Sequence, residues 1–400
     1  MNSLSRRNIL KIGALWTMGS WVNRGMATPI PPHHQEIDRF IEQYAKKYNV
    51  PGLTLCFMKD NNVIYSQAWG LANRKRLIPT SKQSLFRIAS NSKAFTSTAI
   101  FLLIEAGKLK LTDTVFGPNG ILSQYSYASQ PQDWVTTITV HQLLTHTGGG
   151  WGKEINDPMF EKPHLNHHEL IQWTLNTHKL EYPPGQHYDY SNFGYCLLGR
   201  VIEQVTSQPY HTFVHQHILS KIGSADMRIG TNQTAPKEVT YYSQEEIKAY
   251  SMPIARMDSH GGWIARSEDM ARLMTQLFIP LDNPGTAGLL SKESLATMTQ
   301  GTAANSGYAC GLAVNSAGTA WHNGSLPGTT SIMVHTKNGH CWAGVLNTRT
   351  TAPTQISDFD ALLWDIARLL PNWKMDLSSK SRDGQTTGEF GAGEGNRTLV

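Results

Sequence analysis

Apolar positions near the beginning of the 400-residue chain recur with two distinct periods. Between residues 36 and 47 they fall on one face of a helix, as Ile37 and Ile41 illustrate. Residues 53–58 and 63–72 are two strand-like runs on either side of a polar turn, a pattern typical of antiparallel strands. The chain therefore places a helix and the first strands of a sheet before its long middle region.

The last third of the chain returns to strands. Four runs there have the composition of strands, at residues 308–314, 318–325, 331–336 and 340–347. A final helix over 358–370 ends before Pro371. Strands at both ends of a chain with a helical middle predict an α/β (α+β) fold, in which one antiparallel sheet flanked by helices is built from both chain ends. We expect residues 28–85 and 255–375 to form this part, and residues 86–254 to form an all-α insert.

One helix of the middle region opens with a serine and a lysine three residues apart. The segment 86–109 passes from a loop into an apolar helix and places Ser90 and Lys93 at the helix start. Side chains at i and i+3 lie on the same side of a helix, so the Lys93 amine can reach the Ser90 hydroxyl. The unpaired N–H groups and positive dipole end of a helix start favour a developing oxyanion and a neutral lysine. The pair is therefore suited to act as a nucleophile and its base.

Two further segments present polar residues at helix starts. The loop 182–192 contains paired prolines and cannot be helical before its end, so it delivers Tyr190 and Asn192 to the helix that follows. Residues 260–273 are typical of a glycine turn followed by a helix, with Ser267 as the expected N-cap.

Residues 1–27 have the pattern of an export signal, with a basic start, an apolar run and small residues before a cleavage point. Their SerArgArgAsnIleLeuLys segment resembles a twin-arginine signal, which implies bacterial export of a folded protein to the periplasm or the exterior. An uncleaved membrane anchor is the alternative. No later run is long and apolar enough to span a bilayer, so we expect no stable membrane span after signal removal. Residues 376–400 have the composition of a disordered tail.

The formal net charge of +5 comes from the N-terminal segment. Four of the 35 basic residues lie there, and the remaining 31 nearly balance the 30 acidic residues. A nearly neutral body without a basic stripe indicates no nucleic-acid partner.

The four cysteines show neither metal-finger nor redox spacing, so buried free thiols are expected. Cys56 and Cys341 lie in strand-like runs that can be neighbours, and a disulfide between them stays open for an oxidising compartment.

Three short motifs follow one another along the chain: SerAsnSerLys at 90–93, TyrSerAsn at 190–192 and HisAsnGly at 322–324. With LeuLeuThrHisThrGlyGly, ProProGlyGlnHisTyrAspTyrSerAsn and HisGlyGlyTrp, they resemble the signature motifs of the serine β-lactamase and penicillin-binding protein superfamily, and its class C-like branch in particular. The resemblance extends from about residue 36 to residue 373.

The resemblance implies a role for each motif. Ser90 would be the acylated nucleophile, Lys93 would help to remove its proton, and Tyr190 would act as general acid/base. Asn192 would hydrogen-bond the substrate amide or acyl side chain. These roles need no metal and no cofactor.

The third motif departs from many members of the superfamily. Gly324 would allow close backbone approach, and the N–H of Ser325 would join that of Ser90 in an oxyanion hole. His322 stands where many members have lysine, and we expect it to bind rather than to transfer protons. Histidine there resembles D-alanyl-D-alanine carboxypeptidases, D-aminopeptidases and some esterases more than efficient β-lactamases.

Several alternative sites are less well supported. Lys337, Asn338 and Gly339 form a rival third motif, but Asn-Gly between two strand-like runs predicts a hairpin turn. The chain has no SerAspAsn motif of class A β-lactamases and no GlyxSerxGly elbow of α/β-hydrolases.

Two sets of histidines are candidate metal ligands. His211 and His215 are spaced i and i+4, and His164, His167 and His168 cluster in a loop. Neither set has an acidic or cysteine partner at useful spacing, so no metal site is predicted. His146 is expected to fix a loop near the site by a hydrogen bond instead.

The sequence thus predicts an exported serine hydrolase with an acyl-enzyme at Ser90. The expected substrate is a small molecule or a peptide that ends or begins with a D-amino acid, cleaved by D-alanyl-D-alanine carboxypeptidase-like or D-aminopeptidase-like amide hydrolysis. A class C-like carboxylesterase or a β-lactamase is the alternative, and a penicillin-binding sensor module without turnover is an alternative of another class. The oligomeric state stays open.

Overall fold

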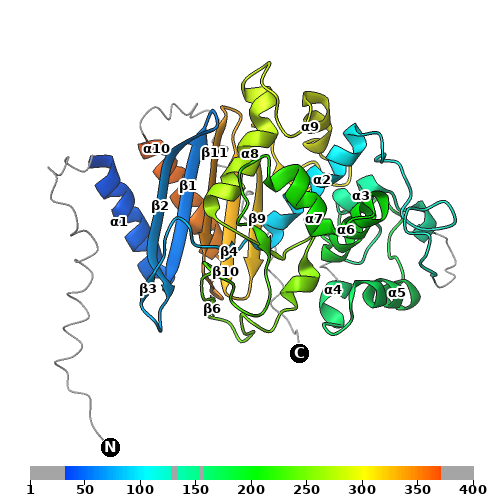
Figure 1. Cartoon of the computed structure of the whole chain (residues 1–400), viewed down its shortest axis with the longest axis horizontal. Helices are drawn as coiled ribbons and strands as arrows, with labels where there is room; N and C mark the ends of the chain where they lie inside the picture. Colours follow the sequence, from blue (N-terminus) through cyan, green and yellow to red (C-terminus); the bar gives the residue numbers. More distant parts are fainter. Residues whose placement is uncertain (1–31, 128–133, 153–156, 371–400) are drawn as a thin grey trace, which may run out of the picture.

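The computed structural model describes residues 32–127, 134–152 and 157–370, so the expected export signal and tail lie outside the described residues. Its main element is a seven-stranded sheet in which neighbouring strands are antiparallel (Figure 1). In spatial order its strands are β3 (Ile78–Pro79), β2 (Asn62–Asn73), β1 (Gly52–Lys59), β11 (His340–Leu346), β10 (Thr329–His335), β9 (Ala320–Leu326) and β8 (Ala313–Val314).

The sheet joins the two ends of the chain at its centre. There β1 pairs with β11, with Leu53 opposite Leu346 and Cys56 opposite Ala343. Every residue of β10 and β11 is buried, because helices cover both faces of the sheet. The predicted fold class, a sheet built from both chain ends and flanked by helices, is confirmed.

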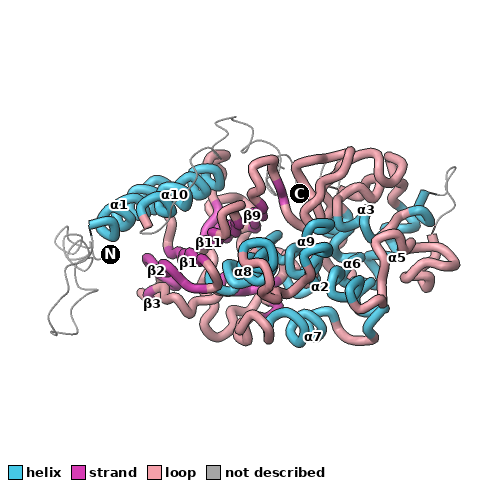
Figure 2. Tube along the Cα trace, turned by 90° about the horizontal axis from the view of Figure 1, so that it is seen from above, coloured by secondary structure: helices cyan, strands magenta, loops and turns pink. Residues whose placement is uncertain are grey.

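Helices α1 (Pro32–Lys47) and α10 (Gln355–Leu369) lie side by side on one face of the sheet, and α8 (Ser267–Asp282) covers the other (Figure 2). The predicted helix over 36–47 begins four residues earlier than expected, and the last helix begins three residues earlier. The apolar stripe of α1 packs against α10 and the outer face of the strands, and its Ile37 and Ile41 are fully buried.

The middle of the chain is helical apart from strands of two residues. Its helices and turns are η3 (Ala89–Asn91), α2 (Ser92–Glu105), η4 (Trp134–Thr137), α3 (Val140–Leu144), α4 (Pro158–Glu161), α5 (His167–Thr177), α6 (Asn192–Thr206), α7 (Tyr210–Val214), the π-helical turn η5 (His215–Leu219) and η6 (Ile254–Met257). A three-stranded sheet of β4 (Phe86–Arg87), β7 (Trp263–Ala265) and β5 (Arg228–Ile229) links this part to the main sheet, together with the pair β12 (Thr348–Arg349) and β6 (Tyr242–Ser243). Helix α9 (Lys292–Met298) packs between α8 and α2.

Helix α2 is buried on nearly all sides. Phe95, Ala99 and Leu103 are in the core as their spacing predicts, while the polar residues between them are buried as well. Helices α6, α7 and α9 surround it (Figure 1). The helix that begins beside Ser90 is therefore held from several directions.

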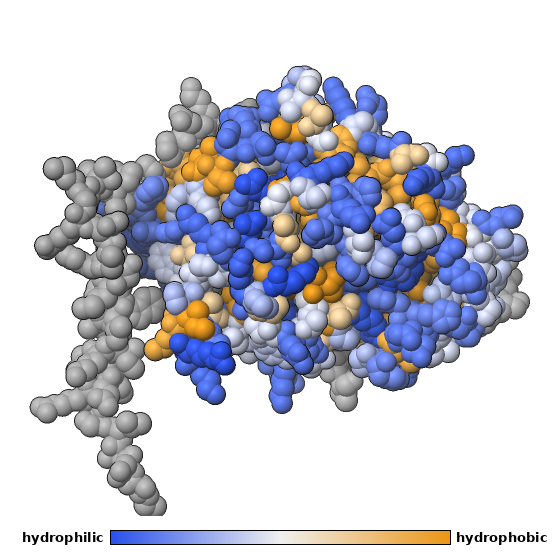
Figure 3. All heavy atoms as spheres, viewed as in Figure 1, coloured by the Kyte–Doolittle hydropathy of each residue, from blue (hydrophilic) through white to orange (hydrophobic). Residues whose placement is uncertain are grey.

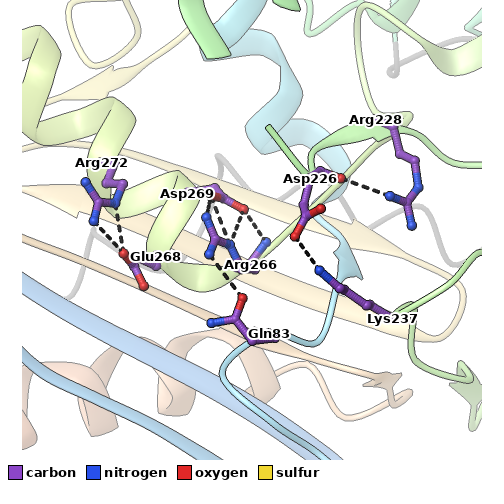
Figure 4. Close-up of polar contacts among 8 residues, drawn as sticks. All are labelled: Gln83, Asp226, Arg228, Lys237, Arg266, Glu268, Asp269 and Arg272. Atoms are coloured by element: carbon purple, nitrogen blue, oxygen red, sulfur yellow. Dashed lines mark hydrogen bonds and ion pairs between the residues drawn. The ribbon is translucent and has the colours of Figure 1, made fainter. Parts of the chain in front are cut away.

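The start of α8 corrects one expectation. Ser267 is the first helical residue, and Arg266 is the N-cap. The buried carboxylate of Asp269 accepts a hydrogen bond from the Arg266 backbone N–H at 2.9 Å and others from its guanidinium. Figure 4 shows this group, with Gln83 accepting from Arg266 at 3.3 Å. An acidic residue three positions into the helix thus caps it without the serine hydroxyl.

The surface view in Figure 3 shows a mainly hydrophilic face with small, separate hydrophobic areas. In the part of the chain that the structure describes, no helix is long and apolar enough to cross a membrane. Cys56 and Cys341 are buried free thiols, so the disulfide that the sequence left open is not formed.

A buried ion pair supports the strand that leads to Ser90. Arg87, fully buried, lies 4.0 Å from Glu238 and donates to the carbonyl oxygens of Ala249 at 2.5 Å and Thr231 at 3.0 Å. Glu238 also accepts from the Tyr241 hydroxyl at 2.8 Å. The guanidinium therefore fixes β4 to two loops of the middle region.

We expect Arg87→Met to lower the free energy of unfolding by about 3–5 kcal/mol, because it leaves a buried carboxylate without its cation. The matched control is Arg39→Met on α1, where an exposed pair with Glu36 at 3.7 Å is expected to contribute less than about 0.5 kcal/mol. Guanidinium denaturation measures both. Equal losses in the two variants would contradict the prediction.

Candidate active site

Ser90 lies in the 3₁₀ turn η3, which is tied to the main sheet before α2 begins. The carbonyl oxygen of Ile88 accepts from the backbone N–H of Asn91 at 3.2 Å, from the Asn91 side-chain amide at 3.2 Å and from the hydroxyl of Ser331 in β10 at 2.8 Å. Ala89 between them has a φ of 48°, a conformation that costs energy for a residue other than glycine. The turn that carries Ser90 is thus held in a strained backbone conformation by the sheet.

Strand β9 lies directly against this turn at Gly324. A Cβ atom there would be 2.3 Å from the Ile88 carbonyl oxygen and 2.3 Å from the Ser331 hydroxyl. Only glycine lets β9 approach so closely. The next residue, Ser325, accepts a hydrogen bond from Arg349 of β12 at 3.2 Å. Arg349 in turn donates to the carboxylate of Glu245 at 2.8 Å.

The Lys93 amine is fully buried and points at Ser90. Its Nζ lies 3.2 Å from Ser90 Oγ, 2.8 Å from the side-chain oxygen of Asn192 and 3.0 Å from the carbonyl oxygen of His260. Burial lowers the pKa of Lys93 to about 7, although the charge of Asp157 opposes this shift. An amine in this state exchanges a proton readily near neutral pH.

Asn192 also contacts Lys93 and Asp157, and its expected contact with the substrate stays a prediction. Its side-chain oxygen accepts from Lys93, and its backbone N–H donates to Asp157 at 2.6 Å. The residue that is expected to contact the substrate thus also accepts a hydrogen bond from the Lys93 amine.

Asp157 is a site residue that sequence reasoning missed. It is buried, it caps α4, and it accepts from the backbone N–H groups of Met159 at 3.0 Å, Asn192 at 2.6 Å and Phe193 at 3.2 Å. Burial raises the pKa of Asp157 to about 6, against the lowering by these hydrogen bonds and Lys93. The Asp-Pro pair was a helix-start signal, but nothing in it indicated proximity to the lysine.

Tyr190 closes the other side of the lysine. Its ring lies over Lys93, with Nζ 4.7 Å from the ring centroid. Burial raises the pKa of Tyr190, and the Ser90 side chain, which faces the phenol, partly offsets the shift. Tyr190 is therefore protonated at neutral pH, as a proton donor must be.

A chain of hydrogen bonds links His146 to His322 through Tyr308, a second residue that sequence reasoning missed. The Ser191 N–H donates to His146 Nδ1 at 3.1 Å, and His146 Nε2 lies 3.2 Å from the Tyr308 hydroxyl. That hydroxyl lies 3.0 Å from His322 Nε2, and His322 Nδ1 lies 2.6 Å from the Asn323 carbonyl oxygen. His146 thus holds the loop that carries Tyr190, as expected.

The other histidines do not join this group. His167 donates to the Arg256 carbonyl oxygen at 2.7 Å, His168 packs on the ring of Tyr125, and His211 and His215 line a separate cavity of about 510 Å³. Within the described ranges, no three or more metal-ligating side chains converge. Lys337, Asn338 and Gly339 form the turn between β10 and β11, as the hairpin prediction required.

Comparison with known proteins agrees with this geometry. A family model described as Beta-lactamase matches residues 37–363. The chain belongs to the beta-lactamase family. The superfamily resemblance derived from the three motifs is thereby confirmed.

Two solved structures show the same beta-lactamase fold. D-amino acid amidase from Ochrobactrum anthropi SV3, complexed with L-phenylalanine amide, has a TM-score of 0.69 at 20% identity and covers 86% of this chain and 99% of its own. The octameric penicillin-binding protein homologue from Pyrococcus abyssi has a TM-score of 0.66 at 22% identity, with 84% and 79% covered. At these identities the likeness concerns the fold alone.

Curated relatives of the chain are distant as well. Protein flp of Staphylococcus aureus (strain NCTC 8325 / PS 47) is 26% identical over 312 residues, which are 75% of this chain and 60% of that protein. A putative D-alanyl-D-alanine carboxypeptidase of Escherichia coli O157:H7 is 26% identical over 325 residues, 70% of this chain and 71% of that protein. The chain spans less than two thirds of the flp proteins that it matches.

We expect Gly324→Ala to lower the free energy of unfolding by about 1–3 kcal/mol, because its Cβ would meet a backbone oxygen and a buried hydroxyl that cannot move away. Gly148→Ala is the control, since a Cβ there meets only Leu143 Cδ2 at 3.4 Å. Urea denaturation of the two variants is the measurement. A neutral Gly324→Ala would show that β9 does not press on the Ser90 turn.

A lowered lysine pKa also predicts a pH dependence of stability. Between the folded pKa of about 7 and the ordinary value of 10.5, the unfolded chain holds a proton on Lys93 that the folded protein lacks. The unfolding free energy should therefore rise with pH in this window, by up to about 1.4 kcal/mol per pH unit. Lys93→Met should remove this contribution.

Denaturation of both proteins between about pH 7.5 and 9.5 isolates the contribution, because other groups cancel in the difference. The wild-type curve should be steeper than that of Lys93→Met. Parallel curves would mean that Lys93 keeps its proton in the folded protein.

Proposed function

We propose that this member of the beta-lactamase family is a serine hydrolase that works through an acyl-enzyme at Ser90. One observation supports this most strongly: the Lys93 amine is fully buried, lies 3.2 Å from Ser90 Oγ and has its pKa lowered to about 7. A lysine that only stabilised the fold would not need to lose its charge beside a hydroxyl. A neutral amine at this distance is a base for the serine.

Acylation would begin with transfer of the Ser90 proton to neutral Lys93, while Oγ attacks the substrate carbonyl carbon. The tetrahedral oxyanion would be held by the backbone N–H groups of Ser90 and Ser325, a role that the close approach of β9 to the Ser90 turn at Gly324 supports. As the carbon–leaving group bond breaks, the leaving group takes a proton from the Tyr190 hydroxyl, and Lys93 returns the serine proton to Tyr190. Attack by water on the ester then releases the acid and restores Ser90.

Buried protein groups support this division of roles. Tyr190 is protonated because burial raises its pKa, so it acts as the acid toward the leaving group. The charge of Asp157 raises the pKa of Lys93 against the lowering by burial and so keeps this pKa near neutral rather than lower. The side-chain oxygen of Asn192 accepts from the amine at 2.8 Å. His322 is neutral and contributes to binding, because burial lowers its pKa to about 3.

The substrate class we propose is an amide of a D-amino acid, in a small molecule or a peptide. The fold neighbours that include D-amino acid amidase and the curated relative described as a putative D-alanyl-D-alanine carboxypeptidase support amide hydrolysis. The histidine in the third motif supports it over β-lactam hydrolysis. We also propose export to the periplasm or the exterior, on the basis of the twin-arginine-like segment alone.

The test is intact-mass spectrometry of the protein after exposure to a fluorescent penicillin and, separately, to p-nitrophenyl acetate, together with assays of D-phenylalanine amide hydrolysis. We expect acylation and hydrolysis to fall at least about 1,000-fold in Ser90→Ala, because the nucleophile is lost. Ser84→Ala, which removes another buried serine hydroxyl, is the matched control.

The outcomes separate the candidate functions. Amide turnover lost in Ser90→Ala supports the proposal. Rapid ester turnover without amide hydrolysis would favour a carboxylesterase, and a stable penicillin adduct without any turnover would favour a sensor module. A folded protein in which no reagent modifies Ser90 would refute catalysis at this residue.

A further inference from the structure

We propose that Tyr308 is a specificity-determining residue that keeps His322 uncharged, so that substrates with an uncharged leaving group are preferred over those with a carboxylate. The inference rests on the proposed function at Ser90. It deepens that function by choosing between two classes of D-amino acid substrate, amides and peptides with a free carboxyl end.

The two ends of the hydrogen-bond chain set the proton positions on both imidazoles. The backbone N–H of Ser191 can only donate, so His146 Nδ1 accepts and its proton is on Nε2. The carbonyl oxygen of Asn323 can only accept, so His322 Nδ1 carries the proton and its Nε2 has a lone pair.

The proton positions on the two imidazoles then determine which hydrogen bonds Tyr308 accepts and donates. Its oxygen accepts from His146 Nε2 at 3.2 Å, and its O–H donates to His322 Nε2 at 3.0 Å. All four hydrogen bonds are satisfied only when both imidazoles are neutral. Protonation of His322 would turn its Nε2 into a donor facing a hydroxyl proton and would leave that buried O–H without its acceptor.

The surroundings oppose a charge on either imidazole. The side chains that face His322 are Tyr308, Tyr190, whose ring centroid is 6.4 Å away, and Lys93, whose charge lowers the pKa of His322 further after burial. His146 is faced by Tyr188, Tyr190, Tyr195 and Tyr308, and burial and Lys93 lower its pKa as well. No carboxylate among these described neighbours would hold an imidazolium.

Nearby cations do not replace the missing charge. Lys93 donates to Asn192 and to the His260 carbonyl oxygen and, with a pKa of about 7, loses its charge as the pH rises through this value, and Arg349 beside Ser325 donates to Glu245. A substrate carboxylate placed against His322 would lose its hydration without gaining a cation or a free donor, because both nitrogens of His322 are engaged, by Tyr308 and by Asn323. An uncharged amide or ester leaving group would lose less hydration there.

The experiment compares two substrates with the same acyl part, D-phenylalanine amide and the dipeptide D-phenylalanyl-D-alanine, which differ in whether the leaving group carries a carboxylate. We expect the wild-type protein to prefer the amide by at least about 10-fold in kcat/KM, mainly through KM, because the penalty falls on binding. Tyr308→Phe keeps the ring and removes the hydroxyl. Without this O–H donor the neutral form of His322 loses one stabilising hydrogen bond, so the imidazole should take a proton at a higher pH than in the wild type, and the preference should fall at least about 5-fold relative to the wild type at pH 6, again through KM.

Tyr44→Phe is the matched control, because it removes a buried tyrosine hydroxyl that donates to the Gln355 carbonyl oxygen at 3.0 Å on the far side of the sheet. It should leave the preference unchanged. Nitrogen NMR of the histidine side chains of the wild-type protein is a second readout that does not depend on the variant folding. It should show His322 neutral with its proton on Nδ1 down to about pH 5.

The outcomes test the role of Tyr308 separately from catalysis at Ser90. A wild-type preference for the dipeptide, an unchanged preference in a folded Tyr308→Phe, or a His322 proton on Nε2 would overturn the role of Tyr308 while leaving catalysis at Ser90 intact. Absence of hydrolysis and of Ser90 acylation by penicillin would instead refute the proposed function, and the inference would fall with it.

Discussion

The structure depends on the contact between strand β9 and the turn that carries Ser90. At this contact the Ile88 carbonyl oxygen collects hydrogen bonds from Asn91 and from Ser331 of β10, and Gly324 brings the β9 backbone against the same atoms. The strained φ of Ala89 persists because the sheet and α2 hold the turn from both sides. A sheet built from the two ends of the chain is thereby joined to a helix from its middle, and the site lies at this junction.

Burial of one cation is the second constraint. Lys93 lies inside the protein with three hydrogen-bond acceptors around it and a tyrosine ring above it. Its environment is balanced, since desolvation lowers the pKa and Asp157 raises it. The pKa of Lys93 is lowered and the pKa of Tyr190 is raised, and both shifts favour the neutral form of the group. Two neutral groups beside one hydroxyl are suited to passing a proton without creating buried charge.

The side of the site at His322 is also uncharged, because of the hydrogen-bond chain through Tyr308. The backbone groups at the two ends of this chain allow only one arrangement of protons on the two imidazoles. His146 and His322 are therefore uncharged and are held in place by hydrogen bonds. The wall that carries a lysine in many members of the superfamily carries here a group whose charge is suppressed by burial and by Lys93. Polar side chains in this site are thus numerous, while formal charges are few.

The sequence alone was enough for the elements that depend on local patterns. Apolar periodicity located the helices around Ile41 and Phe95, and strands at both chain ends implied the sheet, because burial of one face imposes these periods directly. Motif order was enough to propose Ser90 and Tyr190 as site residues. The contributions of Asp157 and Tyr308 were decided only by the tertiary structure, because each acts on a residue far away in the chain. Long-range contacts of this kind leave no spacing in the sequence, and the pKa shifts they cause depend on burial that only the packed fold creates.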